Sequence, residues 1–203
     1  VEHGTSCAVA PDGHVAVTGS FIDTLHLGSI VVGTAPGNGI GGFVACYDAT
    51  GNLEWAHGLS YHHPSGGNCQ AWDVAVDAEG NVFAGGAFSD SLFLDGVKVL
   101  TAPDSLQPLA RAFYVVKFTP EGDMAWAAPV GVGGYTGTLL AIAVDGNGDV
   151  YTTGSDGGQT GRFDKLDGAS GAVLFHYTTV GAGAYINDVA TDAANNVYIL
   201  GLA

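Results

Sequence analysis

Residues 74–86 read Val-Ala-Val-Asp-Ala-Glu-Gly-Asn-Val-Phe-Ala-Gly-Gly, and the same pattern returns at residues 7–19, 142–154 and 189–201. All four copies share an Ala at the second position, a Val at the ninth and a Gly at the last. Successive copies lie 67, 68 and 47 residues apart. Self-similarity of this kind indicates an array of repeated units, each of which hides its apolar face against the next.

Each copy predicts a strand, a tight turn and a second strand. The turns at residues 77–80 and 145–148 contain Asp and Gly, which accept turn dihedrals, and Asn195 replaces the Gly in the last copy. The flanking β-branched and aromatic residues favour strands. The recurring Ala predicts a crowded inner strand, and the recurring Gly predicts a bend or a close backbone approach.

A second block follows each of the first three copies. Residues 43–55 read Phe-Val-Ala-Cys-Tyr-Asp-Ala-Thr-Gly-Asn-Leu-Glu-Trp and align with residues 114–126 and 163–175, where the turn is one residue longer and Phe175 replaces Trp. Each block predicts two further strands, so one period holds the four strands of a propeller blade. We therefore predict an all-β fold, a β-propeller with about three and a half blades, and almost no helix.

The copies begin near residues 6, 73, 141 and 188 and form one array over residues 1–203. The first two copies carry aligned insertions at residues 21–36 and 88–103. Asp95-Gly96 favours a two-residue hairpin turn, so each insertion predicts an extra β-hairpin in its blade. Propellers close with about 4–8 blades. We expect either that the chain is part of a longer protein or that several copies associate.

The two blocks resemble the bacterial SBBP β-propeller repeats, which alternate A-V-D-x-x-G-N-V-Y-V-T-G with F-V-x-K-L-D-x-x-G-x-x-x-W. The resemblance covers nearly the whole chain and departs from the pattern at Cys46, where the family has Lys, and at Phe175, where it has Trp. It implies a secreted or surface-attached protein, located outside a bacterial cell or on its surface. The family has no shared catalytic residues to carry over.

Composition limits the partners. Hydrophobic residues make up 47% of the chain, enough for a packed core, and 33 glycines suit many tight turns. A net charge of −15 repels phosphate backbones, so nucleic acid is not an expected partner. No segment approaches the roughly 20 apolar residues of a membrane span. Cys7, Cys46 and Cys69 match no zinc spacing, and they allow either one disulfide or none.

Two segments contain residue types that bind metals. Asp145, Asn147 and Asp149 place oxygen atoms at alternate positions, as the start of a calcium loop does, so calcium is the only cofactor that the sequence suggests. No Glu follows at the twelfth position, and an ordinary Asx turn explains the same pattern in all copies. His62 and His63, near Cys69, are transition-metal ligand types, but adjacent residues of an extended chain point to opposite sides, so a polar exposed loop is the favoured interpretation.

Aromatic residues are the other binding candidates. Trp72, Tyr61 and Tyr135 fall in the segments between blades, where they could stack on sugar rings, and such loops usually form the binding face of a propeller. Trp55 and Trp126 recur at one fixed position, which indicates core packing. The chain has no Gly-x-Ser-x-Gly elbow and no phosphate-binding loop, so no catalytic residue is assigned.

These patterns favour a non-enzymatic extracellular or cell-surface module for protein interaction, adhesion or assembly. Open strand edges would bind other protein chains or further copies of the same chain. A carbohydrate-binding propeller is the first alternative and uses the loop aromatics. A propeller lyase or hydrolase is the second alternative and requires a metal or clustered ionisable groups at the ring centre.

Overall fold

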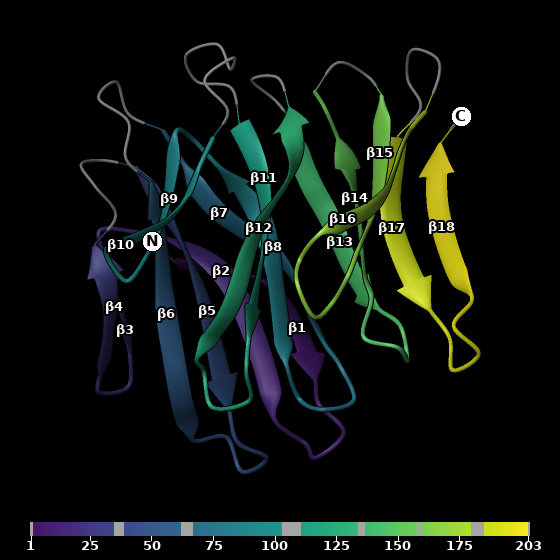
Figure 1. The fold of residues 1–203 in the computed structure, drawn as a ribbon. Helices are drawn as coiled ribbons and strands as arrows, with labels where there is room; N and C mark the ends of the chain where they lie inside the picture. Colours follow the sequence, from purple (N-terminus) through teal and green to yellow (C-terminus); the bar gives the residue numbers. More distant parts are fainter. Residues whose placement is uncertain are drawn as a thin grey trace.

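The computed structural model describes residues 2–34, 39–61, 67–102, 111–133, 137–157, 160–179 and 185–202. These ranges form eighteen strands, and no helix occurs within them. The strands stand side by side in successive sheets, with most hairpin turns at the lower end in Figure 1. The hairpin β3–β4 and the strand β18 lie on opposite sides of the array. The expected all-β fold is confirmed.

Four strands in chain order make one blade, and the array contains three blades and half of a fourth. Blade 1 consists of β1 (Glu2–Val9), β2 (Val15–Ile22), β5 (Ile40–Tyr47) and β6 (Leu53–Tyr61). Blade 2 consists of β7 (Cys69–Val76), β8 (Val82–Phe88), β11 (Arg111–Phe118) and β12 (Met124–Gly133). Blade 3 consists of β13 (Thr138–Val144), β14 (Val150–Ser155), β15 (Gly161–Leu166) and β16 (Val173–Thr178). The half-blade consists of β17 (Tyr185–Thr191) and β18 (Val197–Leu202).

The two insertions form hairpins, as the sequence predicts. They are β3 (Thr24–Leu27) with β4 (Ile30–Thr34), and β9 (Ser91–Leu94) with β10 (Val97–Thr101). Asp95 and Gly96 both have positive φ, 48° and 83°, which is the geometry of the turn that Asp-Gly favours. The hairpin β9–β10 extends the sheet of blade 1, so its order is β1-β2-β5-β6-β9-β10.

The sheet register repeats from blade to blade. Neighbouring strands within each blade are antiparallel, and the repeated Val opens the second strand of every copy. The repeated Ala lies at the same place on each first strand, where Ala8 pairs with Ala16, Ala75 with Phe83, Ala143 with Tyr151 and Ala190 with Tyr198. The four copies are therefore equivalent in structure as well as in sequence.

The hydrophobic core lies mainly between blades. One cluster combines Trp55 and Leu59 of blade 1 with Phe88 and Phe118 of blade 2, and a second joins blades 2 and 3. Burial of this apolar surface is the main stabilising contribution to the array. Cys46 and Cys69 are buried, Cys7 is exposed, and all three are free thiols. The alternative without a disulfide is therefore the one that the structure adopts.

The register corrects one detail of the sequence alignment. Phe43 lies opposite Gly19 in blade 1, and the residue at that place in blade 3 is Arg162, opposite Gly154. The alignment had placed Phe163 there. The turn at residues 167–172 is one residue longer than its counterparts. An alignment without a gap therefore shifts the strand before this turn by one position.

Candidate functional site

Trp72 lies in strand β7 and not in a loop. It is the extra residue of a β-bulge, because Ala71 and Asp73 pair with consecutive residues of β8. The same bulge recurs on the first strand of every copy, at Thr5, Trp72, Leu140 and Asn187. The indole is half-buried, and its Nε1 is buried without a hydrogen-bond partner among the described residues.

The other two aromatic candidates are not brought together with Trp72. Tyr61 is at the end of β6, is only 3% exposed and belongs to the core between blades 1 and 2. Its ring is therefore not available for stacking on a ligand. Tyr135 lies outside the described residues, as do His62 and His63.

The residues of the candidate calcium loop form an Asx turn. One carboxylate oxygen of Asp145 accepts from the backbone N–H groups of Asn147 and Asp149, at 2.9 and 3.0 Å. Its other oxygen accepts from the Tyr151 hydroxyl, and Asp149 forms an ion pair with Lys165 at 2.7 Å. Within the described ranges, no group of three His, Cys, Asp or Glu side chains could hold a metal ion. Calcium binding here stays a prediction.

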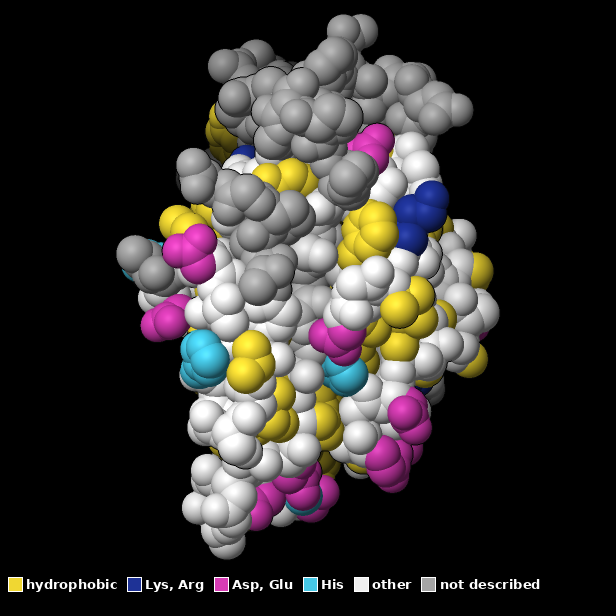
Figure 2. Space-filling view, turned by 90° about the vertical axis from the view of Figure 1, so that its left-hand side faces the viewer, with side chains coloured by type: hydrophobic (Ala, Val, Ile, Leu, Met, Phe, Trp, Pro, Cys, Tyr) yellow, Lys and Arg dark blue, Asp and Glu magenta, His cyan; other side chains and the backbone are white. Residues whose placement is uncertain are grey.

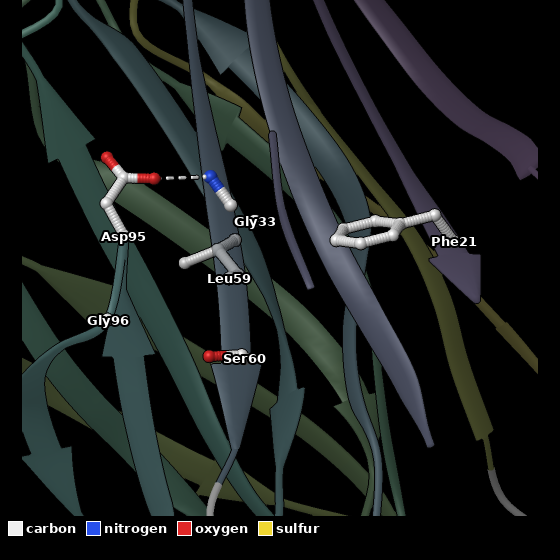
Figure 3. A pocket seen from close by; sticks show the side chains of 7 residues that line it. Phe21, Gly33, Leu59, Ser60, Asp95 and Gly96 are labelled. Carbon is white, nitrogen blue, oxygen red and sulfur yellow. Dashed lines mark hydrogen bonds between the residues drawn. The ribbon is translucent and has the colours of Figure 1, made fainter. Parts of the chain in front are cut away.

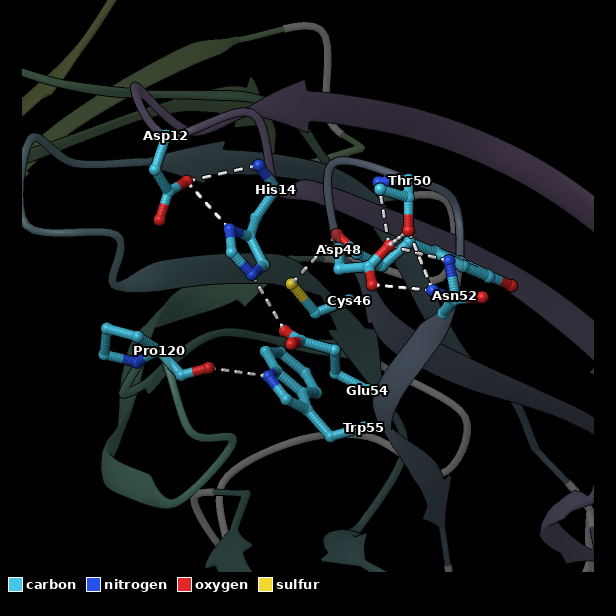
Figure 4. Close-up of polar contacts among 10 residues, drawn as sticks. Asp12, His14, Cys46, Asp48, Thr50, Asn52, Glu54, Trp55 and Pro120 are labelled. Atoms are coloured by element: carbon cyan, nitrogen blue, oxygen red, sulfur yellow. Dashed lines mark hydrogen bonds and ion pairs between the residues drawn. The ribbon is translucent and has the colours of Figure 1, made fainter.

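The hairpin turns make one end of the array acidic. Figure 4 shows two of them in blade 1: the Asp48 carboxylate accepts from Thr50 and Asn52, and the His14 ring lies between Asp12 and Glu54. The hydrogen bond to Asp12 is the main cause that raises the pKa of His14 above its usual value. Acidic side chains also gather at the lower end of the face in Figure 2.

One half-buried carboxylate joins the first strands of three blades. Asp73 follows the bulge of β7, accepts from the Ser6 hydroxyl of β1 at 2.5 Å and accepts from the backbone N–H of Ile142 at 2.7 Å. Burial raises its pKa above the ordinary value, against the lowering effect of these hydrogen bonds. Sequence analysis missed this role, because the partner residues lie far away in the chain.

A second missed group lies between blades 2 and 3. Arg162 donates to both carboxylate oxygens of Asp164, at 2.6 and 2.8 Å, and to the carbonyl of Val130. His176 Nδ1 lies 2.8 Å from the same carboxylate. Asp164 is 1% exposed, so the guanidinium charge balances a carboxylate that water does not reach.

The outer-strand aromatic of one blade rests on a turn of the next. Trp55 Nε1 donates to the carbonyl of Pro120 at 2.9 Å, as Figure 4 shows, and Trp126 Nε1 donates to Gly168 at 3.1 Å. Gly122 has φ +93° in the turn beneath Trp55, where an added Cβ would lie 2.7 Å from the ring. Only glycine fits such a position.

Phe175 occupies the equivalent position in blade 3, where no turn among the described residues covers it. It is 51% exposed, whereas Trp55 is 8% exposed. Other large apolar side chains on β16 and on β18 are also exposed. We call this set the apolar flank: Val173, Leu174, Phe175, Tyr177, Tyr198, Ile199 and Leu200. Large exposed apolar side chains are typical of protein-interaction sites.

The opposite side of the array contains a small cavity. Its volume is about 240 Å³, and it lies between β4, β6 and the β9–β10 turn. Figure 3 shows the lining: the carboxylate of Asp95 accepts from a backbone N–H at one wall, while Phe21, Leu59 and Ser60 lie on others. The donor of that hydrogen bond is Gly58, at 2.8 Å.

The chain resembles known proteins only in part. No family model matches the chain. An uncharacterized WD repeat-containing protein of Acanthamoeba polyphaga mimivirus is 30% identical over 134 residues, which make up 62% of this chain and 9% of that protein. The crystal structure of BamB from Moraxella catarrhalis covers 97% of this chain and 79% of its own, with 15% identity and a TM-score of 0.29.

The WD repeat-containing relative agrees with a propeller-type repeat protein, while the fold itself follows from the repeated sheet register. The chain spans only about 9% of the curated relative that it matches. Membership of the SBBP family stays a prediction. A propeller fold is consistent with a protein-interaction module. No helix long and apolar enough to cross a membrane occurs in the part of the chain that the structure describes.

Proposed function

We propose that this chain is a non-enzymatic protein-interaction module that acts in adhesion or assembly outside a bacterial cell or on its surface. The observation that carries the proposal is the apolar flank, whose large side chains are 44–64% exposed on two strands. Trp55 and Trp126, the counterparts of Phe175 at the two preceding blade junctions, each donate a hydrogen bond to a turn of the next blade. The flank is thus an interface that has no occupant within the described chain.

The backbone of β18 supports the same interpretation. Among the described strands, β18 pairs only with β17, so its other edge carries backbone N–H and C=O groups without a strand partner. A partner strand would satisfy these groups, and its side chains would cover Ile199 and Leu200. Backbone pairing supplies affinity in such complexes, while the side-chain contacts supply specificity.

The setting outside the cell is supported by the resemblance to SBBP repeats. The composition agrees with it, since the chain combines only 5 basic residues with 20 acidic ones. The strong negative charge favours solubility and leaves the apolar flank as the main attractive surface.

Association between copies of the chain tests the proposal. We expect sedimentation velocity to show an apparent mass that rises with concentration. Phe175→Ser and Leu200→Lys should each abolish the rise without loss of fold, because both side chains are exposed. Val97→Ser is the matched control, since Val97 is 67% exposed on β10, outside the flank. A chain that stays monomeric, or association that survives both substitutions, contradicts the proposal.

Glycan binding at Trp72 is a second candidate, and one observation favours it. Its indole is half-buried, so part of the ring is accessible for stacking on a sugar. Binding on a glycan array that Trp72→Ala removes would support this site. Tyr198→Ala is the control, since Tyr198 is an exposed aromatic residue on another strand. An array without any bound glycan argues against it.

A further inference from the structure

The hairpin inserted into blade 2 reaches across to blade 1. Its first strand, β9, pairs antiparallel with β6 over the three residues from Leu59 to Tyr61. The backbone N–H of Asp95 extends this pairing and donates to the carbonyl of Gly58 at 2.9 Å. The outermost strand of blade 1 is therefore covered by a hairpin that its neighbour supplies. We call β9–β10 the clasp hairpin.

The hairpin inserted into blade 1 is built in the same way. Leu25 of β3 and Leu92 of β9 lie 67 residues apart, at the same repeat position, and are 3% and 0% exposed. Asp23 and Asp90 precede these strands, and both have positive φ, 69° and 62°. The second strand, β4, packs beside β6 of its own blade. The two hairpins therefore share one geometry.

The hairpins differ at the second edge of the first strand. β9 has a strand on each side, β10 and β6, whereas β3 pairs only with β4 among the strands described. Side-chain exposure follows this difference. Leu94 is buried while its counterpart Leu27 is half-buried, and Phe93 is half-buried while its counterpart His26 is exposed.

The backbone groups of His26 face this open edge. Leu27 and Ile30 flank the two-residue turn and pair with each other, so the backbone N–H and C=O of Leu27 point toward β4. Backbone groups alternate in direction along an antiparallel strand, so those of His26 and Gly28 point away from β4. The equivalent groups of Phe93 and Asp95 point toward β6, as the Asp95–Gly58 hydrogen bond shows.

We propose that β3 binds the outermost strand of a further propeller blade, antiparallel and in the register that β9 adopts on β6. In β6, Leu59 lies opposite Leu94 and Tyr61 lies opposite Leu92. By the same register, the partner strand places an apolar residue opposite Leu27 and a large residue opposite Leu25. It satisfies the backbone groups of His26 and covers Leu27. An unpaired edge is a template for this kind of addition, and the clasp hairpin shows which occupant the geometry accepts.

This surface is separate from the apolar flank. β3 lies on the side of the array opposite to β18 in Figure 1, and Figure 2 looks at the β3 side, where apolar, acidic and His side chains are interspersed. The proposal goes beyond an interaction role at the apolar flank and assigns the inserted hairpins a function of their own, to hold consecutive blades together from outside.

A peptide experiment on the whole chain tests the proposal. The probe is a synthetic peptide with the sequence of β6, residues 53–61, which represents the outer strand of the partner blade. We expect saturable changes in the backbone amide NMR signals of His26 and Gly28, with slower hydrogen exchange at both. The control peptide carries Ser60→Pro. Ser60 lies opposite Phe93, the counterpart of His26, so the substitution removes the N–H that this pairing uses.

Two variants of the chain locate the binding site. His26→Pro removes the donor at the open edge and keeps the groups that pair with β4, so the response to the peptide should disappear. Leu27→Lys keeps every backbone donor and puts a charge where the apolar residue of the partner packs, so affinity should fall roughly tenfold. Three outcomes each overturn the proposal: signals that change at β16 or β18 instead, an equal response to the Ser60→Pro peptide, or no response at peptide saturation.

Discussion

Nδ1 of His57 lies 2.6 Å from Oδ2 of Asp95, and this contact ties the outer strand of blade 1 to the clasp hairpin of blade 2. Nε2 of the same ring lies 2.7 Å from the carbonyl oxygen of Gly122, in a turn of blade 2. Both partners are acceptors, so the geometry fits the protonated imidazole, in which both ring nitrogens donate. The ring stacks on Phe118 with centroids 4.9 Å apart.

This arrangement predicts that the clasp hairpin weakens as pH rises. Burial opposes the charged ring, but the hydrogen bond and the charge of Asp95 outweigh it and raise the pKa of His57 above its ordinary value. Because the folded pKa is the higher one, the stabilisation is complete below the unfolded pKa of about 6.5 and is lost as pH rises through the folded pKa.

Urea unfolding at several pH values checks this prediction. His57→Gln should lower the free energy of unfolding by roughly 1.5 kcal/mol at acidic pH, as expected for a charged hydrogen bond. The difference from the unaltered protein should shrink above neutral pH. His26→Gln is the matched control, because His26 is exposed on β3. A difference that is independent of pH would mean that the His57 ring is not charged.

Much of the fold is predictable from the repeat. The Ala, Val and Gly columns mark equivalent positions because each blade makes the same contacts with its neighbours, and Asp95-Gly96 predicts its turn from local dihedral preference. Such features depend on residues that are close in sequence, or on spacing that a repeat preserves. They need no knowledge of how the blades are placed in space.

The features that the sequence did not reveal depend on contacts between blades. The bulge that holds Trp72 leaves no composition signal, because Thr5, Leu140 and Asn187 take the same place. β9 and β6 belong to different repeat copies, so an alignment of the copies with one another does not show that these two strands pair. The alignment also hid Arg162 by assigning its position to Phe163. A charged residue at a position held elsewhere by Phe43 would have been the signal to look for a buried partner.

The blade junction predicts opposite outcomes for two equivalent aromatics. Trp55→Ala should lower the free energy of unfolding by about 3–5 kcal/mol, since the indole is buried against Gly122 and donates to Pro120. Phe175→Ala should cost less than about 0.5 kcal/mol, because Phe175 is exposed. Thermal unfolding of both variants measures the contrast. Equal costs would show that Phe175 is covered in solution.

The pair between Arg162 and Asp164 predicts a large effect when one charge is removed. Arg162→Met should destabilise the protein by about 3–5 kcal/mol, because it leaves a buried carboxylate without its main partner. Adding Asp164→Leu should recover most of the loss, since the uncompensated charge is then gone. Lys165→Met, which breaks the more exposed pair with Asp149, should cost about 0–1 kcal/mol. Chemical denaturation of the three variants tests this order.

The turn of the half-blade predicts a measurable change in the pKa of one carboxyl group. The Asn196 side chain donates to Asp192 at 2.9 Å, and with the backbone N–H of the same residue it lowers the pKa of Asp192 to about 2. The hydrogen bonds to the ionised Asp192 therefore stabilise the fold fully above the unfolded pKa of about 3.9, and this stabilisation is lost as pH falls toward 2. Asn196→Ala removes only the side-chain donor, so the pKa should rise part of the way to the ordinary value in a carboxyl NMR titration. Asn52→Ala removes the equivalent bond to Asp48 and should leave Asp192 unchanged. If Asn196→Ala also leaves it unchanged, the backbone N–H groups of the turn and the Tyr198 hydroxyl hold the charge.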